Sequence, residues 1–313
     1  MAQLIKLLDY VSRYESNPFH YPTQYIRLKQ ENWKRINELW EEENEKEILH
    51  AQTEQQIATE KKKFFKWNRF FKQKEPTSDV YEPFKRSLPK SKKQLTQYFL
   101  NELFPFQLKW ATSTISQVSY TDQKYYYDTT LKHFLQRLPD IYLLMYYPIF
   151  TIKKAPIEGE IILISPIGVD IIVLMNDYSD ATILAEDDRT WSVEQGGNVT
   201  KIISPIIALK RTEQIIKRIF STHKIDFTIE KTIISQRSSI LFTNEPYKTS
   251  LIGKREYDKW LEEKRSLRSP LKSTQLRVIE ALLYHCQTTS VKRPEWEDEE
   301  DEYVTPVSYE DQL

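Results

Sequence analysis

The most restrictive feature of the sequence is a pair of short apolar runs near its middle. Residues 161–164 and 169–175 consist mainly of Ile, Leu and Val, and Ser-Pro-Ile-Gly at 165–168 separates them. Runs of this length around a Pro/Gly turn predict the two strands of a β-hairpin. The polar residues within this region exclude a membrane-spanning helix, which needs about 20 apolar residues. We therefore expect a buried hairpin in a soluble domain.

The spacing of apolar residues around the hairpin predicts alternating helices and strands. The predicted elements are a helix around 131–138, a strand over 141–152, weaker strands over 182–185 and 190–193, a helix that begins after Pro205, a strand over 228–242 and a helix over 255–284. Proline is favourable in the first turn of a helix, because the N–H that it lacks would be unpaired there in any case. The alternation predicts a mixed α/β (α+β) domain.

The first third of the chain has a helical pattern. Leu4, Leu7, Leu8 and Val11 follow helical spacing, and a longer helical stretch covers about 25–63. Prolines then interrupt the pattern. We divide the chain into a helical N-terminal region with a basic aromatic segment (1–74), a linker and helix (75–120), the α/β domain (121–290) and an acidic, disordered tail (291–313).

Charge is segregated along a chain that is neutral as a whole, with 45 basic and 45 acidic residues. Residues 36–60 contain eight acidic residues and one Lys, 61–116 contain thirteen basic and four acidic residues, and 294–313 contain nine acidic and no basic residues. Blocks of like charge stay solvated or bind a partner of opposite sign. The acidic tail could therefore screen the basic segment within the same chain.

Residues 61–74 combine seven basic and five aromatic residues and contain no acidic residue. On a helix, most of the rings fall on one face and most of the cations on the other. Such a segment is typical of binding to nucleic acid or to an anionic membrane surface, and the alternative is a helix that packs its rings on the C-terminal domain. The residues of this predicted surface are Lys62, Lys66, Trp67, Arg69, Phe70 and Lys72. The helical arm before it is a candidate surface for a protein partner.

Several functional classes are excluded by what the sequence lacks. It has five glycines and neither a GxxxxGK[ST] nor a GxGxxG motif, so the phosphate loops of the common nucleotide-binding folds are absent. Cys286 is the single cysteine, which excludes an internal disulfide framework and favours a cytoplasmic location. No signal peptide is evident. The five histidines show neither HxxxH nor HExxH spacing, so we expect structural roles for them.

The region from about 127 to 283 resembles the nuclease-related domain (NERD), a branch of the PD-(D/E)XK restriction-endonuclease-like superfamily. The resemblance depends on the hairpin spacing between Gly159 and Gly168, on Trp191 after an acidic turn, and on Ser204 and Pro205 before the next helix. It implies a restriction-endonuclease-like mixed sheet flanked by helices. In active members it also implies an Asp and a Glu that bind a divalent metal, and a Lys that positions or deprotonates water.

The catalytic positions of that family are degenerate in this chain. The positions that match the helix acid, the first metal ligand, the second metal ligand, the lysine and the helix glutamine are Asp128, Glu160, Val173, Met175 and Ala208, in that order. Apolar side chains neither bind Mg²⁺ nor activate water. We therefore expect no catalysis and no cofactor, and Glu160 would be the metal ligand if there were one.

The sequence leaves three hypotheses. The first is a non-catalytic nuclease-related module that associates with nucleic acid or with protein. The second is an active Mg²⁺-dependent nuclease whose ligands have moved to Glu158, Glu160 or Asp170. A slip in strand register is one way in which Asp170 and Asp177, at either end of the second strand, could bind a metal. Such a slip would turn every side chain to the opposite face of the sheet. The third is a scaffold that binds a membrane surface through residues 61–74 and has no transmembrane segment.

Overall fold

The computed structural model describes residues 1–56, 88–242 and 246–293. These form two compact units, one of Met1–Tyr25 with Gln107–Leu313 and one of Ile26–Phe106. The predicted basic surface (Lys62, Lys66, Trp67, Arg69, Phe70 and Lys72) lies outside the described residues, as does the acidic tail from 294 onward. No helix in the described part of the chain is long and apolar enough to cross a membrane.

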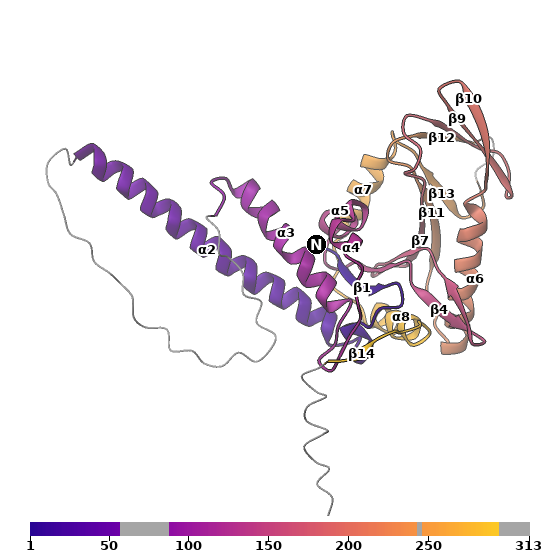
Figure 1. The fold of residues 1–313 in the computed structure, drawn as a ribbon, viewed down its shortest axis with the longest axis horizontal. Helices are drawn as coiled ribbons and strands as arrows, with labels where there is room; N and C mark the ends of the chain where they lie inside the picture. Colours follow the sequence, from indigo (N-terminus) through magenta and orange to yellow (C-terminus); the bar gives the residue numbers. More distant parts are fainter. Residues whose placement is uncertain (57–87, 243–245, 294–313) are drawn as a thin grey trace, which may run out of the picture. The chain divides into compact units, whose positions relative to one another are not determined.

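A six-stranded mixed sheet forms the centre of the first unit (Figure 1). Its strands, in spatial order, are β1 (Gln3–Leu7), β3 (Leu143–Tyr146), β6 (Ile161–Ile164), β7 (Val169–Leu174), β11 (Ile229–Ile234) and β13 (Thr249–Ile252). The pairs β1–β3, β7–β11 and β11–β13 are parallel, whereas β6 is antiparallel to both neighbours. The predicted α/β class is therefore confirmed.

The central hairpin is confirmed with its predicted turn. Strands β6 and β7 pair with Leu163 opposite Asp170 and Ile162 opposite Ile171. The Ser165 hydroxyl accepts hydrogen bonds from the backbone N–H groups of residues 167 and 168, at 3.2 and 3.1 Å, and stabilises the turn. A Cβ at Gly168 would lie 3.2 Å from the Thr228 carbonyl oxygen, so the next segment packs tightly against this turn. The register is thereby fixed, without the slip that would have turned Asp170 to the opposite face.

Helices cover both faces of the central sheet (Figure 1). On one face, α6 (Ile206–His223) begins after Pro205 as predicted, and its Glu213 accepts a hydrogen bond from Lys231 of β11 at 2.9 Å. On the other face, Lys264 of α7 (Tyr257–Ser266) lies 2.9 Å from Asp170 of β7. Adjacent residues of a strand point to opposite faces, so these two polar contacts mark the two sides of the sheet.

Two more helices form hydrogen bonds with the central sheet or with the segments next to its strands. The backbone of Ala2 in the N-terminal segment donates to Leu135 of α5 (Thr129–Arg137) at 2.8 Å. Helix α8 (Ser273–Tyr284) places the buried Gln275 amide against two carbonyl oxygens, those of Ile141 at 2.7 Å and Ile164 at 3.1 Å. Both contacts satisfy backbone groups that would otherwise be buried without partners.

A second, four-stranded sheet contains the predicted weaker strands. Its order is β10 (Asn198–Ile203), β9 (Thr190–Gln195), β8 (Thr182–Ala185) and β12 (Ser239–Phe242). Trp191 of β9 is fully buried, and its indole N–H donates to the Asp187 carbonyl oxygen at 2.9 Å. The minor elements of the first unit are α1 (Arg13–Ser16), β2 (Gln117–Val118), α4 (Lys124–Tyr127), β4 (Ile149–Ile152), β5 (Ala155–Glu158) and β14 (Val291–Lys292).

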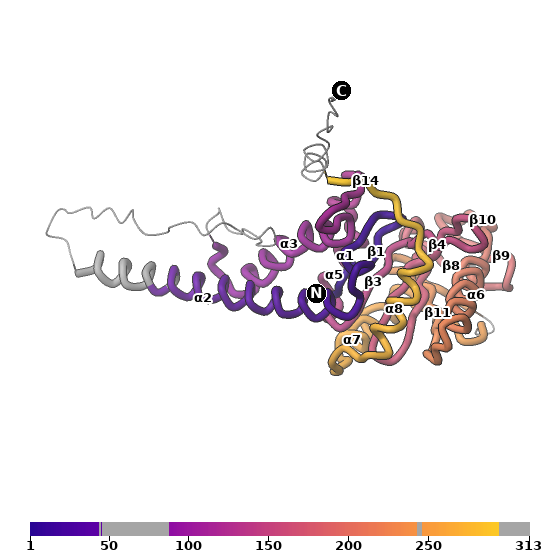
Figure 2. Tube along the Cα trace, turned by 90° about the horizontal axis from the view of Figure 1, so that it is seen from below, coloured from indigo at the N-terminus to yellow at the C-terminus, as the bar shows by residue number. Residues whose placement is uncertain are grey.

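The second unit contains most of α2 (Tyr21–Gln56) and α3 (Lys92–Trp110), which lie side by side (Figures 1 and 2). The Trp33 and Phe99 rings pack with their centroids 5.2 Å apart. The Trp40 indole donates to the Pro89 carbonyl oxygen at 2.6 Å. The ring contact joins the two helices, and the hydrogen bond joins α2 to the segment before α3. The helical interpretation is confirmed over 25–56, and residues 57–63 lie outside the described residues.

Four predicted elements differ from the structure. Residues 3–7 form strand β1 and not a helix, because parallel pairing with β3 buries all five residues. The predicted strand over 141–152 is two strands, since Tyr147 has a positive φ of 48° and Pro148 follows it. The predicted 255–284 helix is likewise two helices, α7 and α8, and the 228–242 strand divides into β11 and β12.

Candidate functional site

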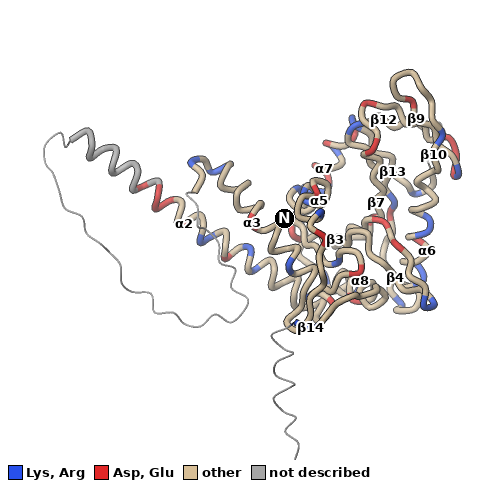
Figure 3. Tube along the Cα trace, viewed as in Figure 1, with Lys and Arg blue, Asp and Glu red and all other residues tan. Residues whose placement is uncertain are grey.

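The candidate site is the end of the central hairpin at which the family resemblance places Glu160. Its carboxylate accepts a hydrogen bond from the Arg211 guanidinium of α6 at 3.2 Å. The Glu160 backbone N–H donates a hydrogen bond to the Thr212 hydroxyl at 3.2 Å. Burial raises the pKa of the Glu160 carboxyl, and the nearby Arg211 charge offsets only part of this effect. Glu160 is thus a partly buried carboxylate whose charge is neutralised by a basic helix (Figure 3).

Val173 and Met175 occupy the other two positions of the expected hairpin motif. Val173 is half-buried in β7, and Met175, directly after this strand, is only 6% exposed. The Met175 backbone N–H donates a hydrogen bond to the carbonyl oxygen of Ile234, the last residue of β11, at 2.8 Å. The hydrogen bond at this residue is thus made by its main chain and not by its side chain. No oxygen ligand and no proton acceptor comes from either side chain.

Asp128, the predicted helix acid, has a structural role at the start of α5. One of its carboxylate oxygens caps the helix by accepting from the Leu131 N–H at 2.9 Å, and the other accepts from the Tyr146 hydroxyl at 2.9 Å. An N-cap of this kind stabilises a helix by about 1 kcal/mol. Both oxygens therefore have partners within the protein.

Tyr147 lies within a group of acidic residues. Burial raises the pKa of Tyr147 to about 12, and the negative charges of Glu160, Asp128, Glu158 and Asp177 act in the same direction. The four acidic residues that the sequence analysis singled out therefore all lie close enough to Tyr147 for their charges to affect its pKa. Within this group, the Arg211 guanidinium offsets the charge of Glu160.

The residues present do not fit a catalytic Mg²⁺ ion. Glu160 has Arg211 as its counter-ion, and among residues 1–56, 88–242 and 246–293 no three His, Cys, Asp or Glu side chains are grouped to hold a metal. Ala208 is a half-buried residue of α6 and supplies no polar group. Asp170 is on the opposite face of the sheet from α6, so it does not converge with Glu160.

Asp170 belongs to a separate polar cavity of about 270 Å³. It accepts a hydrogen bond from the Thr232 hydroxyl at 2.7 Å and pairs with the Lys264 ammonium at 2.9 Å. The Tyr142 hydroxyl donates to the Lys264 carbonyl oxygen at 2.8 Å and so fixes the end of α7 at the cavity. A buried Asp in an apolar run was visible in the sequence, but the position of its cationic partner was not.

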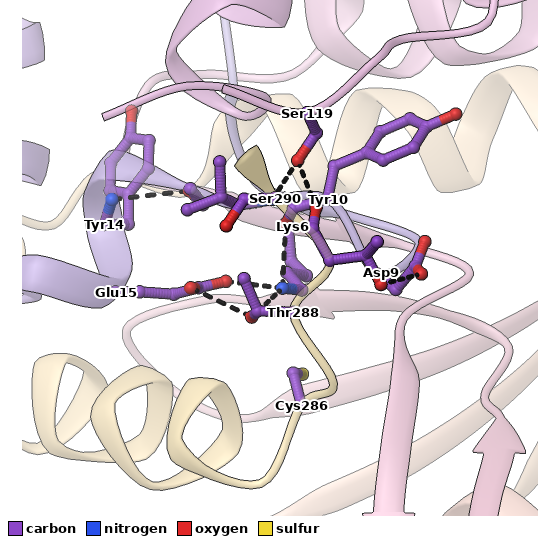
Figure 4. A network of polar contacts seen from close by, with 12 residues as sticks. Lys6, Asp9, Tyr10, Tyr14, Glu15, Ser119, Cys286, Thr288 and Ser290 are labelled. Atoms are coloured by element: carbon purple, nitrogen blue, oxygen red, sulfur yellow. Dashed lines mark hydrogen bonds and ion pairs between the residues drawn. The ribbon is translucent and has the colours of Figure 1, made fainter. Parts of the chain in front are cut away.

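A second polar network, which the sequence did not indicate, surrounds Lys6 (Figure 4). The fully buried Lys6 ammonium donates to the Tyr10 carbonyl oxygen at 2.8 Å, to the Thr288 hydroxyl at 3.0 Å and to the Glu15 carboxylate. The network joins β1 to the segment after α8. Burial raises the pKa of the neighbouring Cys286 to about 12, so the thiol is protonated at neutral pH and a weak nucleophile.

Comparison with known proteins gives little further information. No family model matches the chain, and no solved structure matches it. A segment of 45 residues is 49% identical to part of a protein described as an RNA 2′,3′-cyclic phosphodiesterase from Geobacillus stearothermophilus. That segment covers 14% of this chain and 14% of the relative.

Replacing Glu160 by Gln is expected to increase stability at neutral pH and to have no effect in acid. The pKa of Glu160 is raised in the folded protein, so the folded state binds this proton more tightly than the unfolded state does. Below the pKa that Glu160 has in the unfolded chain, ionisation of Glu160 therefore does not lower the stability of the wild type. The loss of stability develops as the pH rises through the pKa that Glu160 has in the folded protein. Thermal melting from about pH 4 to about pH 8 measures this difference. The exposed Glu194→Gln variant is the control, and a pH-independent stabilisation by Glu160→Gln would contradict the expectation.

Proposed function

We propose that this chain is a non-catalytic nuclease-related domain protein that acts as an interaction module. The observation that carries the proposal is the state of the hairpin site: Glu160 is paired with Arg211, and Val173 and Met175 replace the second ligand and the lysine. Phosphodiester hydrolysis at neutral pH needs a metal-bound or otherwise activated water and stabilisation of the transition-state charge. The hairpin provides neither.

The order of elements supports the family part of the proposal. Helix α5 precedes strand β3, the β6–β7 hairpin follows, and α6 begins directly after Pro205. The small β4–β5 pair lies between β3 and the hairpin, and β8–β10 lie between the hairpin and α6. Strand β11 then returns parallel to β7 and extends the sheet beyond the hairpin.

The surface next to the site favours a protein partner over nucleic acid at this position. Three tyrosines close in sequence to Asp128 are exposed: Tyr120, Tyr126 and Tyr127. Tyrosine is enriched in protein interfaces, because it has a large apolar ring and a polar tip. The acids around Tyr147 include Asp128, which directly follows Tyr127 in the chain. An exposed aromatic surface near a negative field suits a partner with apolar and basic groups.

A cleavage assay tests the proposal. Purified full-length protein is incubated with plasmid, single-stranded DNA, RNA and a nucleoside 2′,3′-cyclic phosphate, in the presence of Mg²⁺ or Mn²⁺. We expect no metal-dependent product from any substrate, and no difference between the wild type and Glu160→Ala. A product formed by the wild type and lost in Glu160→Ala would establish an active nuclease and overturn the proposal. A product from the cyclic phosphate alone would assign phosphodiesterase activity in its place.

A further inference from the structure

Two histidines that are 62 residues apart in sequence meet at the ends of two packed helices. His223 is the last residue of α6, and His285 directly follows α8. Their Nε2 atoms are 3.1 Å apart, and their ring planes are nearly perpendicular at 83°. The Tyr284 ring makes edge-to-face contacts with both imidazoles, at centroid distances of 6.1 and 5.3 Å. Both rings are half-buried, so solvent still reaches the pair.

The chemistry of this contact requires that at least one ring is neutral. Two imidazolium ions would each present an N–H at Nε2 and would repel one another at this distance. The ring that accepts in this contact has a free Nε2 lone pair, which is the form that binds metal ions, and the ring that donates can bind through Nε2 once its proton has moved to Nδ1.

We propose that His223 and His285 form a two-histidine site for a divalent transition-metal ion such as Zn²⁺, Ni²⁺ or Cu²⁺. Two Zn–N bonds of about 2.0–2.1 Å at a tetrahedral angle place the nitrogens about 3.3 Å apart, close to the separation seen here. The separation of the two nitrogens would change by only a few tenths of an ångström, and the rings would turn so that both Nε2 lone pairs point at the ion. Imidazole selects these metals, whereas Mg²⁺ and Ca²⁺ prefer oxygen ligands.

The remaining coordination positions of the metal are open to water. No third His, Cys, Asp or Glu joins the two rings within the described portion of the chain. The site is therefore exchangeable and differs from a closed structural zinc centre with four protein ligands. A bound ion would cross-link the C-terminal ends of α6 and α8.

This site is independent of the proposed function at the hairpin. Thr212, which contacts Glu160, precedes His223 by three turns of α6, or about 16 Å along the helix axis. Loss of one site therefore leaves the other chemically intact. Metal binding by the histidine pair would increase stability through linkage, because the unfolded chain has no preformed site.

The test uses full-length protein without a histidine tag and stripped of metal with a chelator. Titration calorimetry and thermal melting with Zn²⁺ and with Ni²⁺ should show one bound ion per chain and a higher melting temperature, whereas Mg²⁺ should change neither. His223→Gln and His285→Gln should each weaken binding at least tenfold. The matched controls are His20→Gln and His133→Gln. His20 is exposed, whereas His133 is half-buried and its ring contacts the Tyr257 hydroxyl at 2.8 Å. Both controls should bind like the wild type.

A spectroscopic measurement on the wild type removes dependence on the folding of the variants. Cu²⁺ added at one equivalent should give an electron paramagnetic resonance spectrum with couplings to two imidazole nitrogens. Coupling to one imidazole, or unchanged affinity in both histidine variants, would overturn the proposal. Absence of binding by the wild type would also overturn it, and none of these outcomes depends on whether the chain cleaves nucleic acid.

Discussion

Replacing Glu15 by Ala is expected to lower the free energy of unfolding by about 3–5 kcal/mol, one of the two largest effects predicted for this chain. The side chain of Lys6 is 0% exposed and that of Glu15 is 20% exposed, so the pair is largely removed from water. Without Glu15, the partners left to the Lys6 ammonium among the described residues are the Tyr10 carbonyl and the Thr288 hydroxyl. An ammonium ion buried without a counter-ion costs much more than the lost ion pair alone.

The matched variant is Lys6→Met, which removes the buried charge and keeps most of the side-chain volume. Glu15 is partly exposed and can be solvated in this variant, so the loss should be clearly smaller than for Glu15→Ala. Urea denaturation of the two single variants and of the double variant gives the coupling energy. Equal effects of both single changes would show that burial of Lys6 has no special cost, and our account of the network would be wrong.

Restoring the family's residues with Val173→Glu and Met175→Lys is expected to destabilise the protein by about 3 kcal/mol or more. Val173 is half-buried in β7, and Met175, directly after this strand, is only 6% exposed. The new glutamate would also be near Glu160, which is already difficult to ionise. The double variant should remain inactive as a nuclease, because Ala208 and the occupied carboxylate of Asp128 are unchanged.

Val199→Glu with Ile203→Lys is the matched control for these two substitutions. It introduces the same two charges into β10 at positions that are 64% and 79% exposed. Its melting temperature should remain close to that of the wild type, whereas the hairpin variant should melt at a much lower temperature. A hairpin variant as stable as this control would mean that Val173 and Met175 face an open cleft.

The candidate site could be predicted from the sequence only in part. The spacing around the 165–168 turn correctly predicted the hairpin, and thus the positions of Glu160, Val173 and Met175 within it. It could not predict Arg211 as the partner of Glu160, because that contact depends on how α6 packs on the sheet. The acids Asp128 and Asp177 were also named from the sequence, but their common neighbour Tyr147 was not.

Local patterns by themselves determined the hairpin, the start of α6 after Pro205 and the α/β class, because alternation, turn residues and proline act over a few residues. Tertiary structure decided the rest. Residues 3–7 have an apolar spacing that also suits a helix, and pairing with β3, some 140 residues away, makes them a strand. Lys6 with Glu15 and Thr288, and His223 with His285, likewise meet only after the chain has packed. Contacts at such sequence separations depend on the whole fold, and no local preference encodes them.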